Sequence, residues 1–167
     1  MFLKRKSTII ISTALAVFIL DRLTKLAVQS NIGFEDTIPV IRGFFELTYV
    51  RNTGAAFGIM AFARDSFRVP FLLASTAAAI GLLVYFVRKT RDDEYLLLVA
   101  LAMVLGGALG NLADRLVYGY VIDFLYFHVR EYYWPAFNVA DSGITVGVAL
   151  LGFDLLIRKR DTGTAGV

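Results

Sequence analysis

The sequence of 167 residues contains no cysteine, a single histidine and few charged side chains. Without cysteine, the chain forms no disulfide, presents no thiol nucleophile and builds no zinc–thiolate site. His128 cannot assemble a metal cluster alone, and nothing in the pattern pairs it with a serine for triad chemistry. Charged residues make up 19% of the chain and hydrophobic residues 57%, whereas soluble domains average about 45–50% apolar residues. A membrane protein is therefore the first hypothesis.

Four apolar segments approach the roughly 20 residues that a helix needs to cross a bilayer. They cover about residues 8–28, 69–87, 95–112 and 136–157. The first follows basic residues, as in a secretory signal peptide, but no small-x-small cleavage site comes after it. We expect an uncleaved helix, with a cleaved signal as the alternative. Length predicts one membrane domain over 1–167, with a disordered tail over 161–167.

Proline and glycine refine this pattern of helices. Pro70 suits the first turn of the second segment, and Pro135 stands just ahead of the fourth. Glycines spaced four residues apart in the third and fourth segments are typical of helices in close contact. We expect packing to be their role, with ligand contact as the alternative. The pairs are Gly106 with Gly110 and Gly143 with Gly147.

Basic residues indicate how the chain is oriented. They cluster at 4–6, within 88–91 and at 158–160, before the first segment, between the second and third, and after the fourth. With four spans all three clusters fall on one side, which the positive-inside rule makes cytoplasmic. Both termini are then cytoplasmic, and loops 29–68 and 113–134 are extracytoplasmic. Because the basic residues stand beside apolar runs, the net charge of +3 does not indicate a nucleic-acid partner.

The two outer loops carry alternation typical of strands. In residues 45–49 the odd positions are apolar or aromatic and the even ones polar. In residues 121–127, Val121, Asp123, Leu125 and Phe127 alternate with their neighbours, which would place Asp123 on one face of an extended segment. Aromatic residues crowd 118–134, as they do at membrane interfaces. We predict an all-α membrane protein with four transmembrane helices and a small extracytoplasmic β-sheet from the two outer loops.

Three aspartates lie among glycine, aliphatic and aromatic residues: Asp114, Asp123 and Asp141. Carboxylates are costly in apolar surroundings and usually mark function there. Desolvation should raise the pKa of Asp123. Asp141 falls in the first turns of the last helix, where the helix dipole stabilises an anion. Two carboxylates in such different environments can serve one water molecule as acid and base, although spacing alone leaves open two unrelated structural aspartates.

Other polar residues surround these aspartates in the sequence. Asp114 is interpreted as a structural ion-pair partner, with adjacent Arg115 the obvious counterion, and Arg115 also suits a substrate carbonyl or lipid phosphate. Asp21 and Lys25 form an i,i+4 pair near the outer end of the first helix. Asn111 and Asn138 could satisfy buried backbone groups or hold the aspartates, and Asn138 could cap the last helix. We interpret residues 52–58 as a turn, with the lip of a substrate groove as the alternative.

Segments 52–57, 106–115, 121–124 and 137–142 resemble, in this order, the motifs of bacterial lipoprotein signal peptidase (signal peptidase II). The resemblance covers nearly the whole chain, and Gly58 departs from it because the family commonly has serine there. It implies an aspartyl endopeptidase of the bacterial inner membrane that uses no metal or cofactor. The substrate would be a prolipoprotein whose cysteine carries diacylglycerol, cut just before that cysteine. Membrane lipid and the cyclic peptide inhibitor globomycin are the other expected partners, and we expect a monomer.

Residue roles follow from the same resemblance. Asp123 and Asp141 would be the catalytic pair, close to the extracytoplasmic face. Other positions would contact substrate or support the site: Asn52, Gly54, Asn111, Arg115 and Asn138, with Asp114, Asp21 and Lys25 as structural support.

Three other classes compete with this interpretation. A small proton-coupled transporter would place its acids at mid-depth, whereas these cluster toward one face. A magnesium-dependent lipid-phosphate enzyme would use Asp114, Asp123 and Asp141 as oxygen ligands, and inactivation by EDTA would reveal it. A structural membrane subunit would tolerate asparagine at both catalytic positions.

Overall fold

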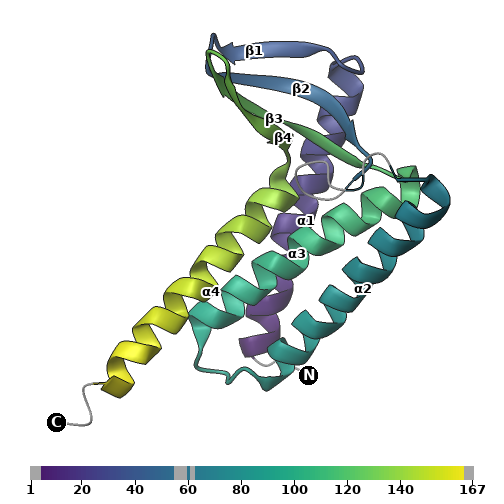
Figure 1. Cartoon of the computed structure of the whole chain (residues 1–167). Coiled ribbons are helices and arrows are strands. Elements are labelled where there is room, and N and C mark those ends of the chain that lie inside the picture. The colour runs from purple at the N-terminus through teal and green to yellow at the C-terminus, as the bar shows by residue number, and fades with distance from the viewer. Residues whose placement is uncertain (1–4, 55–59, 61–62, 164–167) are drawn as a thin grey trace.

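A computed structural model describes residues 5–54, 60 and 63–163, with side chains described as far as Ile157. Four helices and four strands follow one another as α1 (Arg5–Asn31), β1 (Thr37–Ile41), β2 (Phe45–Asn52), α2 (Asp65–Lys89), α3 (Tyr95–Tyr118), β3 (Val121–Val129), β4 (Tyr132–Phe137) and α4 (Val139–Gly163). The sheet lies at one end of the helices, and the α2–α3 connection lies at the other end (Figure 1).

The sheet is antiparallel, with the strand order β1-β2-β3-β4. In the centre, Val50 of β2 pairs with Asp123 of β3, and Asn52 pairs with Val121. Pro135, expected just ahead of the last helix, lies instead within β4. Because β4 is an edge strand, an imino acid without an N–H is tolerated there.

The helix α3 packs against each of the other three helices. Its glycines allow close approach: a Cβ on Gly106 would lie 2.5 Å from the backbone oxygen of Ala14, and one on Gly107 would overlap that of Ala140. In α4, a Cβ on Gly147 would lie 2.8 Å from the backbone oxygen of Ala100. The small-xxx-small pattern therefore marks helix contacts, as its spacing predicts.

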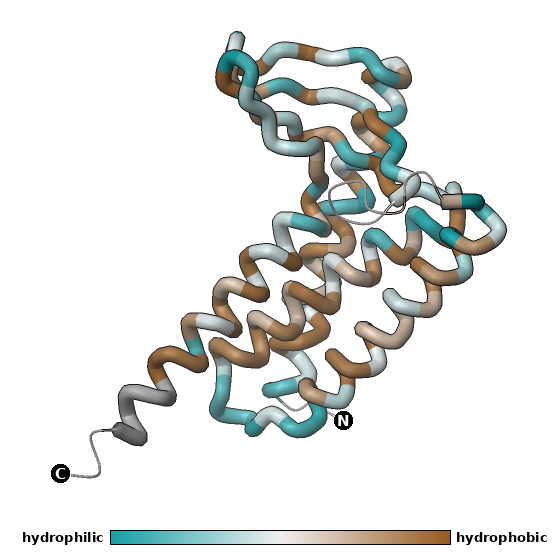
Figure 2. Tube along the Cα trace, viewed as in Figure 1, coloured by the Kyte–Doolittle hydropathy of each residue, from teal (hydrophilic) through white to brown (hydrophobic). Residues whose placement is uncertain are grey.

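Among the described residues, three helical segments are long and apolar enough to cross a membrane: Asp65–Lys89, Tyr95–Tyr118 and Val139–Ile157. Apolar residues recur along these helices (Figure 2), and many of their large apolar side chains are exposed, among them Phe71, Leu82 and Leu155. Such a surface suits lipid rather than water. The helix α1 is not among the three, and it carries the charged residues Asp21, Arg22 and Lys25.

Several predicted helix ends are wrong. The second helix begins at Asp65 instead of Val69, so that Pro70 lies inside it rather than in its first turn. The third runs on from residue 112 to Tyr118, where Gly119 ends it in the left-handed conformation with φ +78°. The fourth begins after β4, at Val139, and continues to Gly163, so residues 161–163 of the predicted disordered tail are helical. The remainder of that tail lies outside the described residues.

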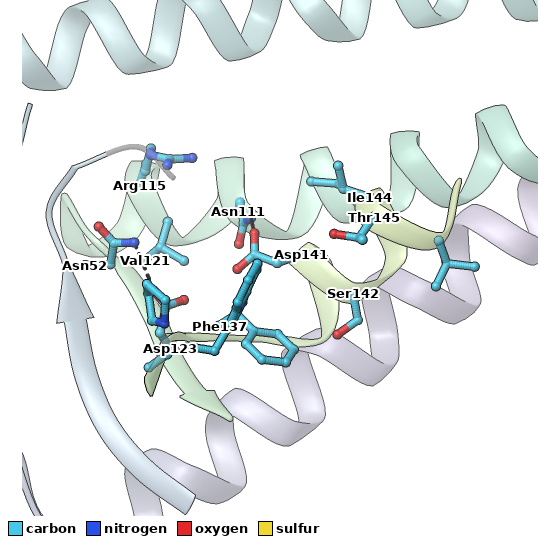
Figure 3. A pocket seen from close by; sticks show the side chains of 14 residues that line it. Asn52, Asn111, Arg115, Val121, Asp123, Phe137, Asp141, Ser142, Ile144 and Thr145 are labelled. Atoms are coloured by element: carbon cyan, nitrogen blue, oxygen red, sulfur yellow. Dashed lines mark hydrogen bonds between the residues drawn. The ribbon is translucent and has the colours of Figure 1, made fainter. Parts of the chain in front are cut away.

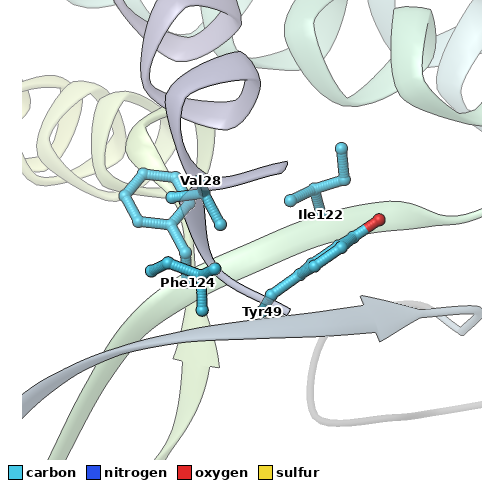
Figure 4. Close-up of a cluster of buried hydrophobic side chains, with 5 residues drawn as sticks. Val28, Tyr49, Ile122 and Phe124 are labelled. Carbon is cyan, nitrogen blue, oxygen red and sulfur yellow. The ribbon is translucent and has the colours of Figure 1, made fainter. Parts of the chain in front are cut away.

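A small apolar cluster fixes the sheet to α1. Val28 and Ile32 of α1 are buried together with Tyr49, Ile122 and Phe124 of the sheet (Figure 4). Side chains alternate along a strand, so Asp123, between two residues of this cluster, points to the opposite face of β3. The apolar contact therefore aims a carboxylate away from α1.

Candidate active site

A cavity of about 630 Å³ lies where the sheet meets α3 and α4 (Figure 3). Asp123 and Asp141 both line it, one from a strand and one from a helix. The other lining residues include the polar Asn52, Asn111, Arg115, Ser142 and Thr145 and the mainly apolar Val121, Trp134, Pro135, Ala136, Phe137, Ile144 and Val146. The two aspartates, which stand on different secondary-structure elements, thus line the same cavity.

Asp123 is buried, with 2% of its surface exposed. The Nδ2 of Asn52 donates to its Oδ2 at 2.9 Å, and the Nδ2 of Asn138 donates to its Oδ1 at 2.8 Å. Burial and, after it, the charge of Asp141 raise the pKa of Asp123 to about 7, against the lowering effect of the two amide donors and of Lys25. This side chain is therefore ready to gain or lose a proton near neutral pH.

Asp141 takes part in a reciprocal cap at the start of α4. The Oδ1 of Asn138 accepts a hydrogen bond from the backbone N of Asp141 at 2.9 Å, and the backbone N of Asn138 donates to Asp141 Oδ2 at 3.3 Å. Asn138 is the capping residue, as considered from the sequence. The second oxygen of Asp141, Oδ1, accepts from Asn111 Nδ2 at 2.7 Å. Capping thus leaves this oxygen for contacts inside the cavity.

Asn138 joins the two aspartates. Besides Asp123, its Nδ2 donates to Asn111 Oδ1 and to the backbone oxygen of Ile122, each at 3.2 Å. Asn111 in turn donates to Asp141. Both asparagines therefore hold the aspartates, which was one of the two roles considered for them.

Asn52 lines the cavity, and Gly54 contacts Asn52 from the segment that follows β2. The backbone N of Gly54 donates to Asn52 Oδ1 at 3.0 Å, and the Nη2 of Arg115 donates to the backbone oxygen of Gly54 at 3.3 Å. The predicted turn therefore begins at Asn52, and α3 holds it from the other side. Residues 55–58 of that turn lie outside the described residues.

A group of four charged side chains, three of them buried, lies behind the cavity. Lys25 Nζ is 2.8 Å from both Asp21 Oδ2 and Asp114 Oδ2, and Arg22 Nη1 contacts the other oxygen of Asp114. The pairing of Asp21 with Lys25 is present as predicted. Asp21 Oδ1 also accepts from the backbone N of Ala140 at 2.9 Å, so the group joins α1 to the start of α4.

The expected pairing of Asp114 with Arg115 is wrong. Consecutive residues on a helix point in different directions and cannot face each other. Asp114 points toward α1, whereas Arg115 lines the cavity. Sequence reasoning missed Arg22, although its position one turn before Lys25 places both cations on one face of α1.

The arrangement does not favour the three-aspartate magnesium site. Within the described part of the chain, no three His, Cys, Asp or Glu side chains are grouped in a way that could hold a metal ion. The two carboxylate oxygens of Asp114 form ion pairs with Lys25 and Arg22. What remains in the cavity is a pair of carboxylates, which suits acid–base chemistry on a water molecule.

Comparison with known proteins places these features in a family. The model of the family described as "Signal peptidase (SPase) II" matches residues 13–157. The chain is 42% identical to the lipoprotein signal peptidase of Syntrophus aciditrophicus, over 95% of this chain and 99% of that protein. It is 46% identical to the lipoprotein signal peptidase of Geobacter sulfurreducens, over 89% of this chain and 92% of that protein.

Solved structures agree with the sequence relatives. A bacterial membrane enzyme determined by the in meso method at 2.3 Å resolution superposes with a TM-score of 0.81 at 33% identity, covering 91% of this chain and 90% of that one. A second, at 1.9 Å resolution, gives a TM-score of 0.78 at 35% identity, covering 88% and 92%. The chain therefore belongs to the signal peptidase II family and is a peptidase.

Proposed function

We propose that this chain is a membrane aspartyl endopeptidase that removes the signal peptide from diacylglyceryl-modified prolipoproteins, cutting just before the lipidated cysteine. The family supplies the substrate class. The observation that carries the chemistry is the presence of Asp123 and Asp141 in one cavity. We assign the catalytic roles to these two residues.

The two environments suggest a division of labour. Asp141 sits at the N-terminus of α4, where a carboxylate is stabilised as an anion. Asp123, with its pKa raised to about 7 by burial, supplies the protonated partner. Asp141 takes a proton from water as the water oxygen attacks the scissile carbonyl, and Asp123 donates to the carbonyl oxygen. When the tetrahedral intermediate collapses, the C–N bond breaks, protonated Asp141 transfers its proton to the leaving amine, and Asp123 takes back a proton from a hydroxyl group of the intermediate.

The shape of the cavity suits a lipidated peptide. Its lining combines the two carboxylates with apolar side chains, including Ile144 and Val146 on α4. Val146 is also exposed on the outer surface of that helix. Acyl chains can therefore remain in lipid while the peptide bond reaches the carboxylates. The inhibitor globomycin, a cyclic peptide, is proposed to occupy the same cavity.

The topology that we propose has four transmembrane helices in the bacterial inner membrane and a monomeric chain. The helix α1 has 27 residues, about 40 Å at a helical rise of about 1.5 Å per residue. Its intramembrane charges find partners inside the protein. Lys6 contacts the backbone oxygen of Thr90 and lies 3.9 Å from Asp92, so two basic clusters meet at the end opposite the sheet. That end is assigned to the cytoplasm, together with both termini.

A cleavage assay with matched precursors tests this function. The purified chain in detergent is incubated with a prolipoprotein precursor that carries diacylglycerol on its cysteine, and with the same precursor unmodified. We expect cleavage of the lipidated precursor only, with a product that begins at the lipidated cysteine by mass spectrometry, and inhibition by globomycin. Equal cleavage of the unmodified precursor, or none of the lipidated one, would contradict the proposal.

A further inference from the structure

Lys25 is fully buried and does not line the cavity, yet it contacts a residue that does. Its Nζ donates to Asn111 Oδ1 at 3.1 Å, and Asn111 Nδ2 donates to Asp141 Oδ1 at 2.7 Å. We propose that Lys25 is a positioning residue for Asp141, acting through the side-chain amide of Asn111. This inference rests on the catalytic role proposed for Asp141.

The direction of the hydrogen bonds carries the argument. A lysine ammonium group has three donors and no acceptor. Three oxygens surround it: Asp21 Oδ2 and Asp114 Oδ2 as ion-pair partners at 2.8 Å, and Asn111 Oδ1 as the acceptor of a hydrogen bond. Asn111 must therefore turn its oxygen toward Lys25. An amide rotated by half a turn would place its NH₂ against the ammonium group and its oxygen against the carboxylate of Asp141, so both contacts would become repulsive.

Because Lys25 fixes the orientation of the Asn111 amide, the amide always presents its NH₂ group to Asp141. Asn111 and Asp141 lie next to each other in Figure 3, where the helices α3 and α4 meet. Oδ2 of Asp141 is held by the backbone N of Asn138, and Oδ1 by Asn111. With both oxygens bound, the carboxylate has one orientation, and its remaining lone pairs are left for water in the cavity.

The partners of Asn111 also set the size of the effect. Asn138 Nδ2 is a second donor to Asn111 Oδ1, at 3.2 Å, but it is neutral and is shared with two other acceptors. Lys25 is the charged donor, and hydrogen bonds from charged groups are about twice as strong as neutral ones. We therefore expect loss of Lys25 to weaken the orientation of Asn111 without abolishing it.

The groups that face the two aspartates come from several elements. Asp141 is faced by Asn111 and Arg115 from α3, by Asn138 and by Asp123. The positive charge of Lys25 also lowers the pKa of Asp123. Loss of that charge in Lys25→Met should move the alkaline limb of the pH profile upward, separately from the loss of kcat that follows from the release of Asn111.

The first test replaces Lys25 with methionine, which keeps the length and removes the donors. Because Lys25→Met leaves Asp21 without a cation, Asp21→Asn/Lys25→Met is made as a second variant, in which the lost charges cancel. Arg22→Met is the matched control, since Arg22 binds Asp114 but has no contact with Asn111 among the described interactions. Turnover of lipidated precursor gives kcat, KM and the pH profile, and thermal unfolding in detergent reports folding.

We expect kcat to fall by about ten- to a hundredfold in both Lys25 variants, the size of one hydrogen bond to a charged group. KM should stay near the wild-type value because Lys25 does not itself line the cavity, and Arg22→Met should keep most of its kcat. A wild-type kcat in the double variant, an equal loss in Arg22→Met, or a change confined to KM would overturn the proposal.

Asn111→Asp provides a test that keeps Lys25 in place. The new carboxylate still accepts from Lys25 but offers no donor to Asp141, so kcat should fall at least as far. Full kcat in this variant would overturn the proposal, even if both Lys25 variants fail to fold. Failure of the wild-type chain to cleave lipidated precursor would instead contradict the proposed function itself.

Discussion

At the scale of single residues, every oxygen of the two aspartates accepts a hydrogen bond from an amide. Asn52 and Asn138 donate to Asp123, while Asn111 and the backbone of Asn138 donate to Asp141. Neutral donors fix the positions of the carboxylates without tying either one to a cation. The nearby cations of α1 are instead bound to two other acids behind the site. The pair is therefore positioned firmly and remains free to exchange one proton.

A change at Asn52 should move the pH dependence of the enzyme. We take protonated Asp123 as the active form, so activity falls as pH rises through its pKa of about 7. Asn52→Leu removes a donor that stabilises the ionised form, which raises this pKa. The alkaline limb of kcat/KM against pH should then move up by about one unit.

The matched control for this experiment is Asn31→Leu. Asn31 is exposed, and its side-chain amide donates to the backbone oxygen of Ala27. This variant should leave the limb where it is in the wild type. A limb that moves to lower pH in Asn52→Leu would show that Asp123 does not act in its protonated form.

At the scale of elements, the glycine face of α3 brings the parts of the site together. A Cβ on Gly106 would meet α1 and one on Gly107 would meet α4, so both helices lie against the backbone of α3. This close approach lets Asn111 contact Lys25 on one helix and Asp141 on the other. Wider spacing would break this link.

Gly107→Ala should separate α3 from α4. The added methyl group would overlap the backbone oxygen of Ala140, which cannot rotate away. Overpacking of this kind costs about 1–3 kcal/mol, and displacement of Asp141 should lower kcat as well. Thermal unfolding in detergent and precursor turnover measure the two effects.

Gly81→Ala in α2 serves as the control. A Cβ there meets nothing within 4 Å, and alanine stabilises a helix by about 0.5–1 kcal/mol relative to glycine. The two substitutions should therefore act in opposite directions on stability. Similar unfolding temperatures for both variants would contradict the close contact of α3 with α4.

The sequence predicts the centres of these elements better than their ends. Alternation reveals residues 45–49 and 121–127, whereas β1 and β4 contain Pro39 and Pro135 and show no comparable pattern. Hydropathy predicts that the third helix ends at residue 112, because the polar residues Asp114 and Arg115 follow. The helix continues because α1 supplies the counterions of Asp114, a contact between residues far apart that no local pattern encodes.

In the candidate site, too, local features can be predicted from the sequence, whereas contacts between distant residues cannot. The expectation that desolvation raises the pKa of Asp123 follows from its apolar neighbours alone, and the structure agrees. The capping role of Asn138 is also local and could be read from the sequence. The bonds of Asn111 to Lys25 and Asp141 depend on how three helices pack, so the sequence left its role open.

At the scale of the whole molecule, the ends of the bundle differ. The α2–α3 connection carries charged residues at one end, and the sheet exposes aromatic residues at the other, among them Tyr132, Tyr133 and Trp134. Apolar residues recur along the helices between them (Figure 2), and large apolar side chains such as Leu82, Leu116 and Leu155 are exposed there. This distribution suits a bilayer around the helices, with the sheet and the cavity on the outer side.

Labelling of single cysteines tests this orientation, and the chain has no native cysteine to interfere. Tyr132→Cys lies in the sheet, where Tyr132 is 82% exposed, and Asp92→Cys lies in the α2–α3 connection, where the side chain of Asp92 is 68% exposed. A membrane-impermeant maleimide should label the first in intact spheroplasts and the second only after the membrane is opened. The reverse pattern would invert the proposed topology.

The most direct test of the two-aspartate site is turnover of lipidated precursor by Asp123→Asn and Asp141→Asn in native membranes. Asp36→Asn, at an exposed aspartate ahead of β1, is the matched control. Loss of a positioned acid or base costs about 10²–10⁴-fold in rate. We therefore predict that both catalytic variants insert and fold like the wild type but leave the precursor uncut, while the control cleaves normally. Wild-type cleavage by either Asp123→Asn or Asp141→Asn would contradict the account.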